Sequence, residues 1–242
     1  SLHMLGCIYK DRGQLEKAIE LMKASISVDA SNPISLLNLG KTFILAGQHA
    51  TACQVFNQSL HINPHVSETW FCFGNALKEL QKFDGAQTAY KNALKLNSDH
   101  IAAASNLGAL LTDLGELDEA KKLLENAIEK APEDINLRIN YGRVLACVND
   151  HVSALAQYLL ALPSASNSTE LYLNIANSYL RNGDYQESVN FFSKYYDLKP
   201  IAQVFSLPLS SEVSNVSSNL LTIPPCPKDV EFIPSYISED IP

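Results

Sequence analysis

A glycine recurs through most of this chain at one fixed interval, and that interval constrains the fold more than any other feature. Five glycines stand thirty-four residues apart, with Ala176 in the sixth place: Gly6, Gly40, Gly74, Gly108 and Gly142. Twelve residues after each marker comes a second small residue: Ala18, Ala52, Ala86, Ala120, Ala154 and Ser188. A unit of this length cannot bury its apolar face alone, so six repeats must stack on one another.

Large apolar residues keep their own places in the same period. They lie three and sixteen residues after each marker: Tyr9, Phe43, Leu77, Leu111, Leu145 and Tyr179, then Met22, Phe56, Tyr90, Leu124, Tyr158 and Phe192. A turn position separates the two sets: Gly13, Gly47, Gln81, Gly115, Asn149 and Gly183. Small residues let two helices approach closely, and large residues fill the space beside that contact. The predicted repeat is therefore helix, tight turn, helix.

These residues resemble the tetratricopeptide repeats, whose 34-residue signature runs Trp, two residues, Leu-Gly, two residues, Tyr, then Ala, three residues, Phe, then Pro. The third repeat carries the pattern, and prolines close other repeats: Trp70, Phe73, Gly74, Leu77, Ala86 and Tyr90, with Pro64, Pro132 and Pro200. The resemblance implies an all-α fold, a right-handed superhelix over residues 1–202. The implied repeats are 1–32, which is incomplete, 33–66, 67–100, 101–134, 135–168 and 169–202.

The fifth repeat departs from the pattern. It has Arg138 where the aromatic residue is expected, and Asn149 and His151 at its turn. Its second helix meets Leu162-Pro163-Ser164. Because proline removes a helical hydrogen bond and clashes with the preceding turn, we expect this helix to end early.

Both ends of the chain indicate a fragment. Ser1 falls inside the first repeat, and the period vanishes in residues 203–242, an irregular tail rich in proline and serine. We expect this tail to link to a further domain outside the chain. Residues 230–240 look like the opening strand and turn of many iron- and 2-oxoglutarate-dependent oxygenase domains, which implies that the iron ligands would follow beyond Pro242.

Composition excludes several partners. The net charge is −8 and the basic residues are scattered, whereas nucleic-acid binding requires Lys and Arg gathered on one face. No run of about 18 apolar residues is present, so we expect no membrane span. The cysteines are odd in number and never form a Cys-x-x-Cys pair: Cys7, Cys53, Cys72, Cys147 and Cys226. This usage predicts free thiols and a cytoplasmic location.

Catalytic patterns are absent from the sequence. It has no phosphate-binding loop, nucleophile elbow or dinucleotide fingerprint. His61 and His65 are four residues apart, but Pro64 lies between them and no third ligand is near, which favours two turn histidines over a zinc site. For this chain we expect no enzymatic activity, no metal and no cofactor.

The informative polar residues flank the marker position. Four asparagines lie two residues before it: Asn38, Asn106, Asn140 and Asn174. One residue after it come Lys41, Asn75, Arg143 and Asn177. In the family the first helix of each repeat lines a concave groove, so the resemblance puts these side chains there. An amide offers a donor and an acceptor together, which matches the backbone of an extended peptide. The alternative is that the asparagines satisfy local backbone groups.

Two functions follow from this ladder of asparagines. The first is a protein-interaction scaffold that binds an extended peptide or a partner helix in the groove. The second is the substrate-recruiting arm of a larger modifying enzyme, a glycosyltransferase or an oxygenase, because the ladder resembles the repeat arm of O-linked N-acetylglucosamine transferases. The two-carboxylate clamp of chaperone-binding family members is missing, since its places are held by Leu37, Phe71, Ala102 and Asn106. Two uncapped apolar ends also favour end-to-end self-association.

Overall fold

A computed structural model describes residues 1–198, which form twelve α-helices and one short 3₁₀-helix. The first helices of the repeats are α1 (Leu2–Asp11), α3 (Pro33–Leu45), α5 (Ser67–Glu79), α7 (Ile101–Leu114), α9 (Ile135–Cys147) and α11 (Thr169–Asn182). The second helices are α2 (Leu15–Val28), α4 (His49–Ile62), α6 (Phe83–Leu96), α8 (Leu117–Lys130), α10 (His151–Ala161) and α12 (Tyr185–Leu198). The fold is all-α, as predicted. The predicted tail and residues 199–202 lie outside the described residues.

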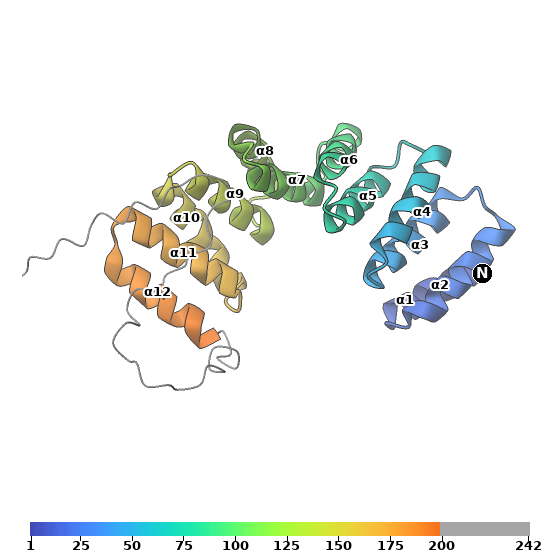
Figure 1. Cartoon of the computed structure of the whole chain (residues 1–242), viewed down its shortest axis with the longest axis horizontal. Coiled ribbons are helices and arrows are strands. Elements are labelled where there is room, and N and C mark those ends of the chain that lie inside the picture. Colours follow the sequence, from blue (N-terminus) through green and yellow to red (C-terminus); the bar gives the residue numbers. More distant parts are fainter. Residues whose placement is uncertain (199–242) are drawn as a thin grey trace, which may run out of the picture. The chain divides into compact units, whose positions relative to one another are not determined.

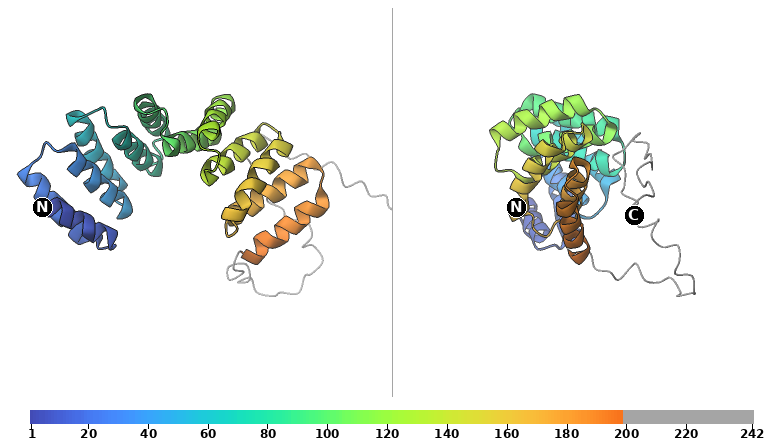
Figure 2. Two further views of the ribbon diagram at one scale, coloured as in Figure 1. Left: turned by 180° about the vertical axis from the view of Figure 1, so that it is seen from behind. Right: turned by 90° about the vertical axis from the view of Figure 1, so that its left-hand side faces the viewer.

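The chain divides into two units. Unit 1 comprises Ser1–Leu110 with Lys122–Leu137, and unit 2 comprises Leu111–Lys121 with the chain from Arg138 onward. In unit 1, α1 packs beside α2, α3 beside α4 and α5 beside α6; in unit 2, α11 packs beside α12 (Figures 1 and 2). The second helix of one repeat also packs on the first helix of the next, as α4 does on α5 and α10 on α11. The sequence period is therefore a period of helix pairs.

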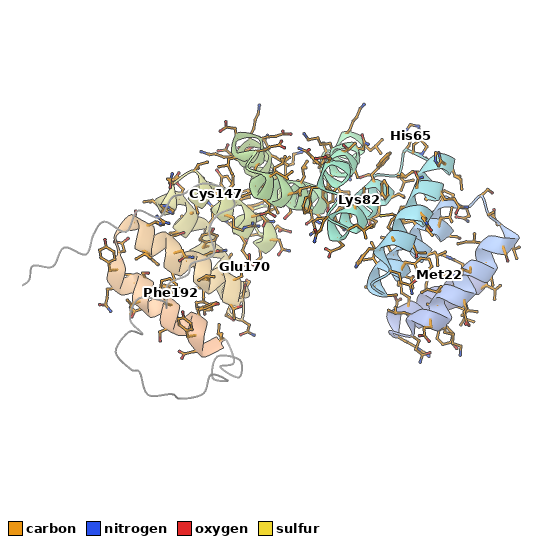
Figure 3. The ribbon with its side chains drawn as sticks, viewed as in Figure 1. Met22, His65, Lys82, Cys147, Glu170 and Phe192 are labelled. Atoms are coloured by element: carbon orange, nitrogen blue, oxygen red, sulfur yellow. The ribbon has the colours of Figure 1, made fainter. Side chains whose placement is uncertain are left out.

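The marker glycines allow each pair to close. A Cβ atom added at Gly74 would lie 2.6 Å from Cε1 of Tyr90, and one added at Gly6 would lie 2.8 Å from Cγ of Met22, which Figure 3 labels on α2. Five alanines of the second helices are fully buried: Ala18, Ala52, Ala86, Ala120 and Ala154. In the last pair the buried Ser188 hydroxyl donates a hydrogen bond to the carbonyl of Ala176 at 2.9 Å. Small side chains thus set the helix spacing.

The turn between the two helices of a repeat keeps its backbone conformation even where the residue type changes. Gly13, Gly47 and Gly183 have φ values of 74°, 71° and 88°, in the left-handed region that ends many helices. Gln81 and Asn149 adopt the same conformation, with φ values of 58° and 63°. The two residues that replace glycine therefore follow the turn that the other repeats make.

The fifth repeat is shortened, as its sequence predicts. Helix α10 has 11 residues, whereas α4 and α12 have 14 each. It ends at Ala161 and passes into a 3₁₀-turn at Leu162–Ser164. Pro163 explains this end because it has no N–H to continue the α-helical ladder. No helix among residues 1–198 is long and apolar enough to cross a membrane.

Candidate peptide-binding face

The first helices of unit 1 meet through polar side chains at the predicted positions. The Nδ2 atom of Asn38 on α3 lies 3.1 Å from Nε2 of His3 on α1. Lys41, one turn further along α3, donates from Nζ to Oε1 of Glu68 on α5 at 2.6 Å. Asn38 and Lys41 are both half-buried. Each of these predicted ligand-binding side chains therefore contacts the neighbouring repeat.

Asn75 on α5 and Asn106 on α7 form one hydrogen-bond network. The Tyr90 hydroxyl donates to Oδ1 of Asn75 at 2.7 Å, and Nδ2 of Asn106 donates to the same oxygen at 2.8 Å. Burial raises the pKa of the Tyr90 phenol, and the nearby Asn106 amide partly offsets that rise. The network joins the third repeat to the fourth and keeps a buried phenol satisfied.

Glu68 contacts three side chains in unit 1, those of Lys41, Cys72 and His100. Its Oε2 atom lies 3.2 Å from Nε2 of His100, whose Nδ1 accepts the Ala103 N–H at 3.3 Å, so the proton of His100 is assigned to Nε2. The Cys72 thiol lies 3.7 Å from Oε1 of Glu68. Burial raises the pKa of Glu68, but the hydrogen bonds from Lys41 and His100 and the charge of Lys41 outweigh it, and the net pKa is lowered. We call the side chains of Asn38, Lys41, Glu68, Asn75 and Asn106 the polar face of unit 1.

The predicted residues on α9 in unit 2 are also engaged. Arg143 donates from Nη2 to Oδ1 of Asp113 at 2.6 Å. Asn140 is half-buried on the same helix and interacts with a neighbouring group. Arg138, which replaces the aromatic residue of the repeat, donates to Oε1 of Gln157 on α10 at 3.2 Å. These contacts hold α9 within its unit.

Asn174 and Asn177 on α11 differ from the other predicted residues. Nδ2 of Asn174 and Oδ1 of Asn177 are buried atoms without a hydrogen-bond partner. Being three residues apart on one helix, the two side chains share a face. An unpaired buried polar atom costs about 1–3 kcal/mol. A ligand that completes both hydrogen bonds would recover part of that cost.

Reactive groups are few within the described residues. Between residues 1 and 198 no three His, Cys, Asp or Glu side chains gather closely enough to hold a metal ion. Cys7, Cys53 and Cys72 are free, and burial raises the pKa of the Cys72 thiol to about 12. These three cysteines agree with the prediction of free thiols, which stays a prediction at Cys147, while Cys226 lies outside the described residues.

Comparison with known families accounts for the helix pairs. Sequence models of the tetratricopeptide repeat match residues 1–32, 35–65, 77–139, 110–169 and 169–201. Together these matches take in most of the chain. The chain belongs to the tetratricopeptide repeat family.

Several curated tetratricopeptide repeat relatives are much longer than this chain. BBSome complex member BBS4 of Bos taurus is 25% identical over 142 residues, which are 59% of this chain and 27% of BBS4. Tetratricopeptide repeat-containing protein trd-1 of Caenorhabditis elegans is 28% identical over 183 residues, 74% of this chain and 23% of that protein. Human protein O-mannosyl-transferase TMTC1 is 24% identical over 181 residues, 59% of this chain and 20% of that protein. The chain spans about a quarter of the length of these relatives.

Solved tetratricopeptide repeat structures share the fold. PilF of Pseudomonas aeruginosa matches with a TM-score of 0.73 at 17% identity, over 82% of this chain and 90% of PilF. YrrB, described as a TPR protein with an unusual peptide-binding site, matches with a TM-score of 0.62 at 17% identity, over 74% of this chain and 92% of YrrB. At these identities the likeness establishes the fold alone.

Sequence reasoning missed Glu68, His100 and the role of Tyr90. Side chains of successive first helices in unit 1 meet at several separations close to one repeat but not equal to it, such as 35 residues for Asn38 and His3. Lys41 and Glu68 are 27 residues apart, and Glu68 and His100 are 32 apart. A search for opposite charges at these separations would have found the cluster, whereas a search at the exact period of the repeat could not.

Proposed function

We propose that this chain is a protein-interaction scaffold that binds the main chain of an extended peptide, or a partner helix, and that α11 of unit 2 makes the principal contacts. Membership of the tetratricopeptide repeat family supports the general role, since the family typically serves protein-protein interaction. The unpaired amide atoms of Asn174 and Asn177 support the location.

The chemistry of α11 favours a peptide backbone. Every residue of an extended peptide other than proline carries one N–H donor and one C=O acceptor. Nδ2 of Asn174 supplies a donor for the carbonyl, and Oδ1 of Asn177 supplies an acceptor for the N–H. Each asparagine as a whole is only half-buried, so part of its side chain lies at the surface where a ligand would approach. Such contacts tolerate many peptide sequences.

The polar face of unit 1 has a different part in this proposal. Asn38, Asn75 and Asn106 each make a hydrogen bond within the protein, and Lys41 is paired with Glu68. An amide group can still make further hydrogen bonds. We therefore assign these residues mainly to holding neighbouring repeats together, with weaker contacts to the peptide. Arg143 and Asn140 have the same secondary role in unit 2.

A second candidate is the substrate-recruiting arm of a larger modifying enzyme. The similarity to a protein O-mannosyl-transferase favours it, as does the short share of that relative that this chain spans. The asparagine pattern of O-linked N-acetylglucosamine transferases and the oxygenase-like residues 230–240 point to the same class, although those residues lie outside the described part. The similarity to a BBSome complex member instead favours the first candidate, with a protein complex as the partner. The cytoplasmic location and end-to-end self-association stay predictions.

The experiment starts from a peptide of defined sequence, selected by phage display against the whole 242-residue chain. Its fluorescein-labelled form is titrated by fluorescence anisotropy against the chain and against the double variant Asn174→Ala/Asn177→Ala. We expect the variant to bind at least about tenfold more weakly, which is about 1.4 kcal/mol. Replacing Asn190, an exposed amide on α12, with Ala is the matched control and should leave binding unchanged.

A second arm tests whether the backbone is recognised. A version of the same peptide with N-methylated main-chain amides lacks the N–H donors, and we expect it to lose binding to the unaltered chain. Equal affinity of the double variant and the unaltered chain, with circular dichroism showing the same helicity, would exclude α11 as the main site. Full binding of the N-methylated peptide would exclude recognition of its N–H groups.

A further inference from the structure

A pocket of about 400 Å³ lies between α4, α5 and the start of α6 in unit 1. Its lining comprises Ala50, Cys53, Gln54, Asn57, Phe73, Leu77, Leu80 and Lys82. None of these residues belongs to the polar face of unit 1 or to α11, so the pocket is separate from the proposed peptide site.

The contact of α2 with α3, one repeat before the contact of α4 with α5, indicates why a pocket forms at the later contact. At the contact of α2 with α3, Ile19 stands at the position of Cys53 and Lys23 at the position of Asn57, each one repeat earlier. The Nζ atom of Lys23 lies 5.5 Å from the centre of the Phe43 ring, so the long lysine side chain covers Phe43 where α2 contacts α3. Cys53 and Asn57 are shorter and leave space beside Leu77, which occupies the position equivalent to Phe43 and lines the pocket. We attribute the pocket to these two shorter side chains.

The lining combines an apolar wall with a single charge. Phe73, Leu77 and Leu80 form the wall on the side of α5. Burial raises the pKa of the Cys53 thiol, and the positive charge of Lys82, which lines the same pocket, partly offsets that rise. Cys53 is therefore neutral and adds to the apolar wall. Lys82, at the turn between α5 and α6 in Figure 3, is exposed and has no ion-pair partner within the described residues.

We propose that this pocket binds a small carboxylic acid with an apolar body. The body lies against Phe73, Leu77 and Leu80, and the carboxylate pairs with the Lys82 ammonium. Ligand pockets are mostly apolar, hold about 300–1,000 Å³ and carry a few polar groups that orient the ligand; the 400 Å³ found here falls in this range. An acid is favoured over an amine because Lys82 is the only charged residue of the lining.

The test uses 3-phenylpropionate as the probe and its neutral amide, 3-phenylpropionamide, as the matched control. Each is titrated into the ¹⁵N-labelled chain and followed by the chemical shifts of backbone amides. We expect both to shift amides of α4, α5 and Lys82, with the acid binding about two- to fivefold more tightly, the effect of one partly exposed ion pair. Saturation of neither probe at millimolar concentration would overturn the proposal.

Two variants copy residues that the chain already uses at equivalent positions. Lys82→Gln reproduces Gln48 of the previous repeat and should reduce the affinity for the acid to that for the amide. Cys53→Ile with Asn57→Lys reproduces Ile19 and Lys23, fills the pocket and should abolish the shifts from both probes. Unchanged shifts of α1 and α2 amides would show that the variants are folded.

Alkylation of Cys53 gives an independent readout. N-ethylmaleimide labelling, followed by mass spectrometry, should be slowed at Cys53 by 3-phenylpropionate but not at Cys7, which is also free and half-buried. Equal labelling of Cys53 with and without the acid, or full binding to the filled-pocket variant, would contradict binding in this pocket. Equal affinities of acid and amide would contradict the role of Lys82.

Discussion

The asparagines of α5 and α11 occupy equivalent positions in two repeats but differ in their hydrogen bonds. Asn75 accepts from the Tyr90 hydroxyl and from Asn106, whereas Oδ1 of Asn177 is buried and unpaired. The residue at the position of Tyr90 in the sixth repeat is Phe192, labelled in Figure 3, which has no hydroxyl to donate. Equivalent positions in two repeats can thus carry the same asparagine while only one of the two has a hydrogen-bond partner. That difference separates asparagines paired within the stack from asparagines whose polar atoms lack a partner there.

The largest expected effect comes from replacing the two asparagines with leucine. Asn75→Leu leaves the buried Tyr90 hydroxyl and an Asn106 donor without their acceptor, at a cost of about 1–3 kcal/mol for each group left unpaired. Asn177→Leu removes an acceptor that was already unpaired, so the free energy of unfolding should stay the same or rise. Urea unfolding measures the free energy of unfolding of both variants. For Asn75→Leu, hydrogen exchange should place the loss of stability in α5 and α6. Equal destabilisation by the two variants would remove the distinction between the helices.

A pair of reciprocal variants isolates the hydroxyl. Phe192→Tyr adds the missing donor near Asn177 and should raise stability by about 0.5–1.5 kcal/mol, the net value of one hydrogen bond. Tyr90→Phe should lower it by a similar amount. Once Asn177 is paired internally, Phe192→Tyr should also weaken binding of the selected peptide, whereas Tyr90→Phe should not. Tighter peptide binding by Phe192→Tyr would show that an unpaired Asn177 is not the basis of recognition.

The architecture could be predicted from the sequence because it depends on steric size at fixed spacing. Gly74 lies so close to Tyr90 that no larger side chain fits there. Helix α10 ends just before Pro163, which has no N–H to continue the helical hydrogen bonds. The state of each polar residue could not be predicted in this way. It depends on the residue that a neighbouring helix presents, such as Tyr90 or Phe192, and on contacts such as Lys41 with Glu68 that do not recur with the period of the repeat.

The smallest expected effect is a difference between the units in their response to acid. Burial and the positive charge of Arg181 lower the pKa of His151 in unit 2, and Asp150 only partly offsets this. Below pH 6.5, the ordinary pKa of histidine, the unfolded chain binds a proton that the folded unit resists, so stability falls as the pH drops. In unit 1 the pKa of Glu68 is lowered from 4.5, so its contribution is present above pH 4.5 and is lost only in stronger acid.

Hydrogen exchange at pH 7.5 and pH 5.5, with ionic strength held constant, measures this difference. Correcting for intrinsic exchange rates, we expect protection of α10 and α11 amides to fall at the lower pH while protection of α5 amides stays the same. His151→Leu, which copies Leu15 and Leu117 at the equivalent position, should remove most of the fall because leucine has no proton to gain. The effect should be modest, since His151 is only half-buried and water screens its charge. The same loss of protection in the leucine variant would mean that another group, and not His151, makes unit 2 sensitive to acid.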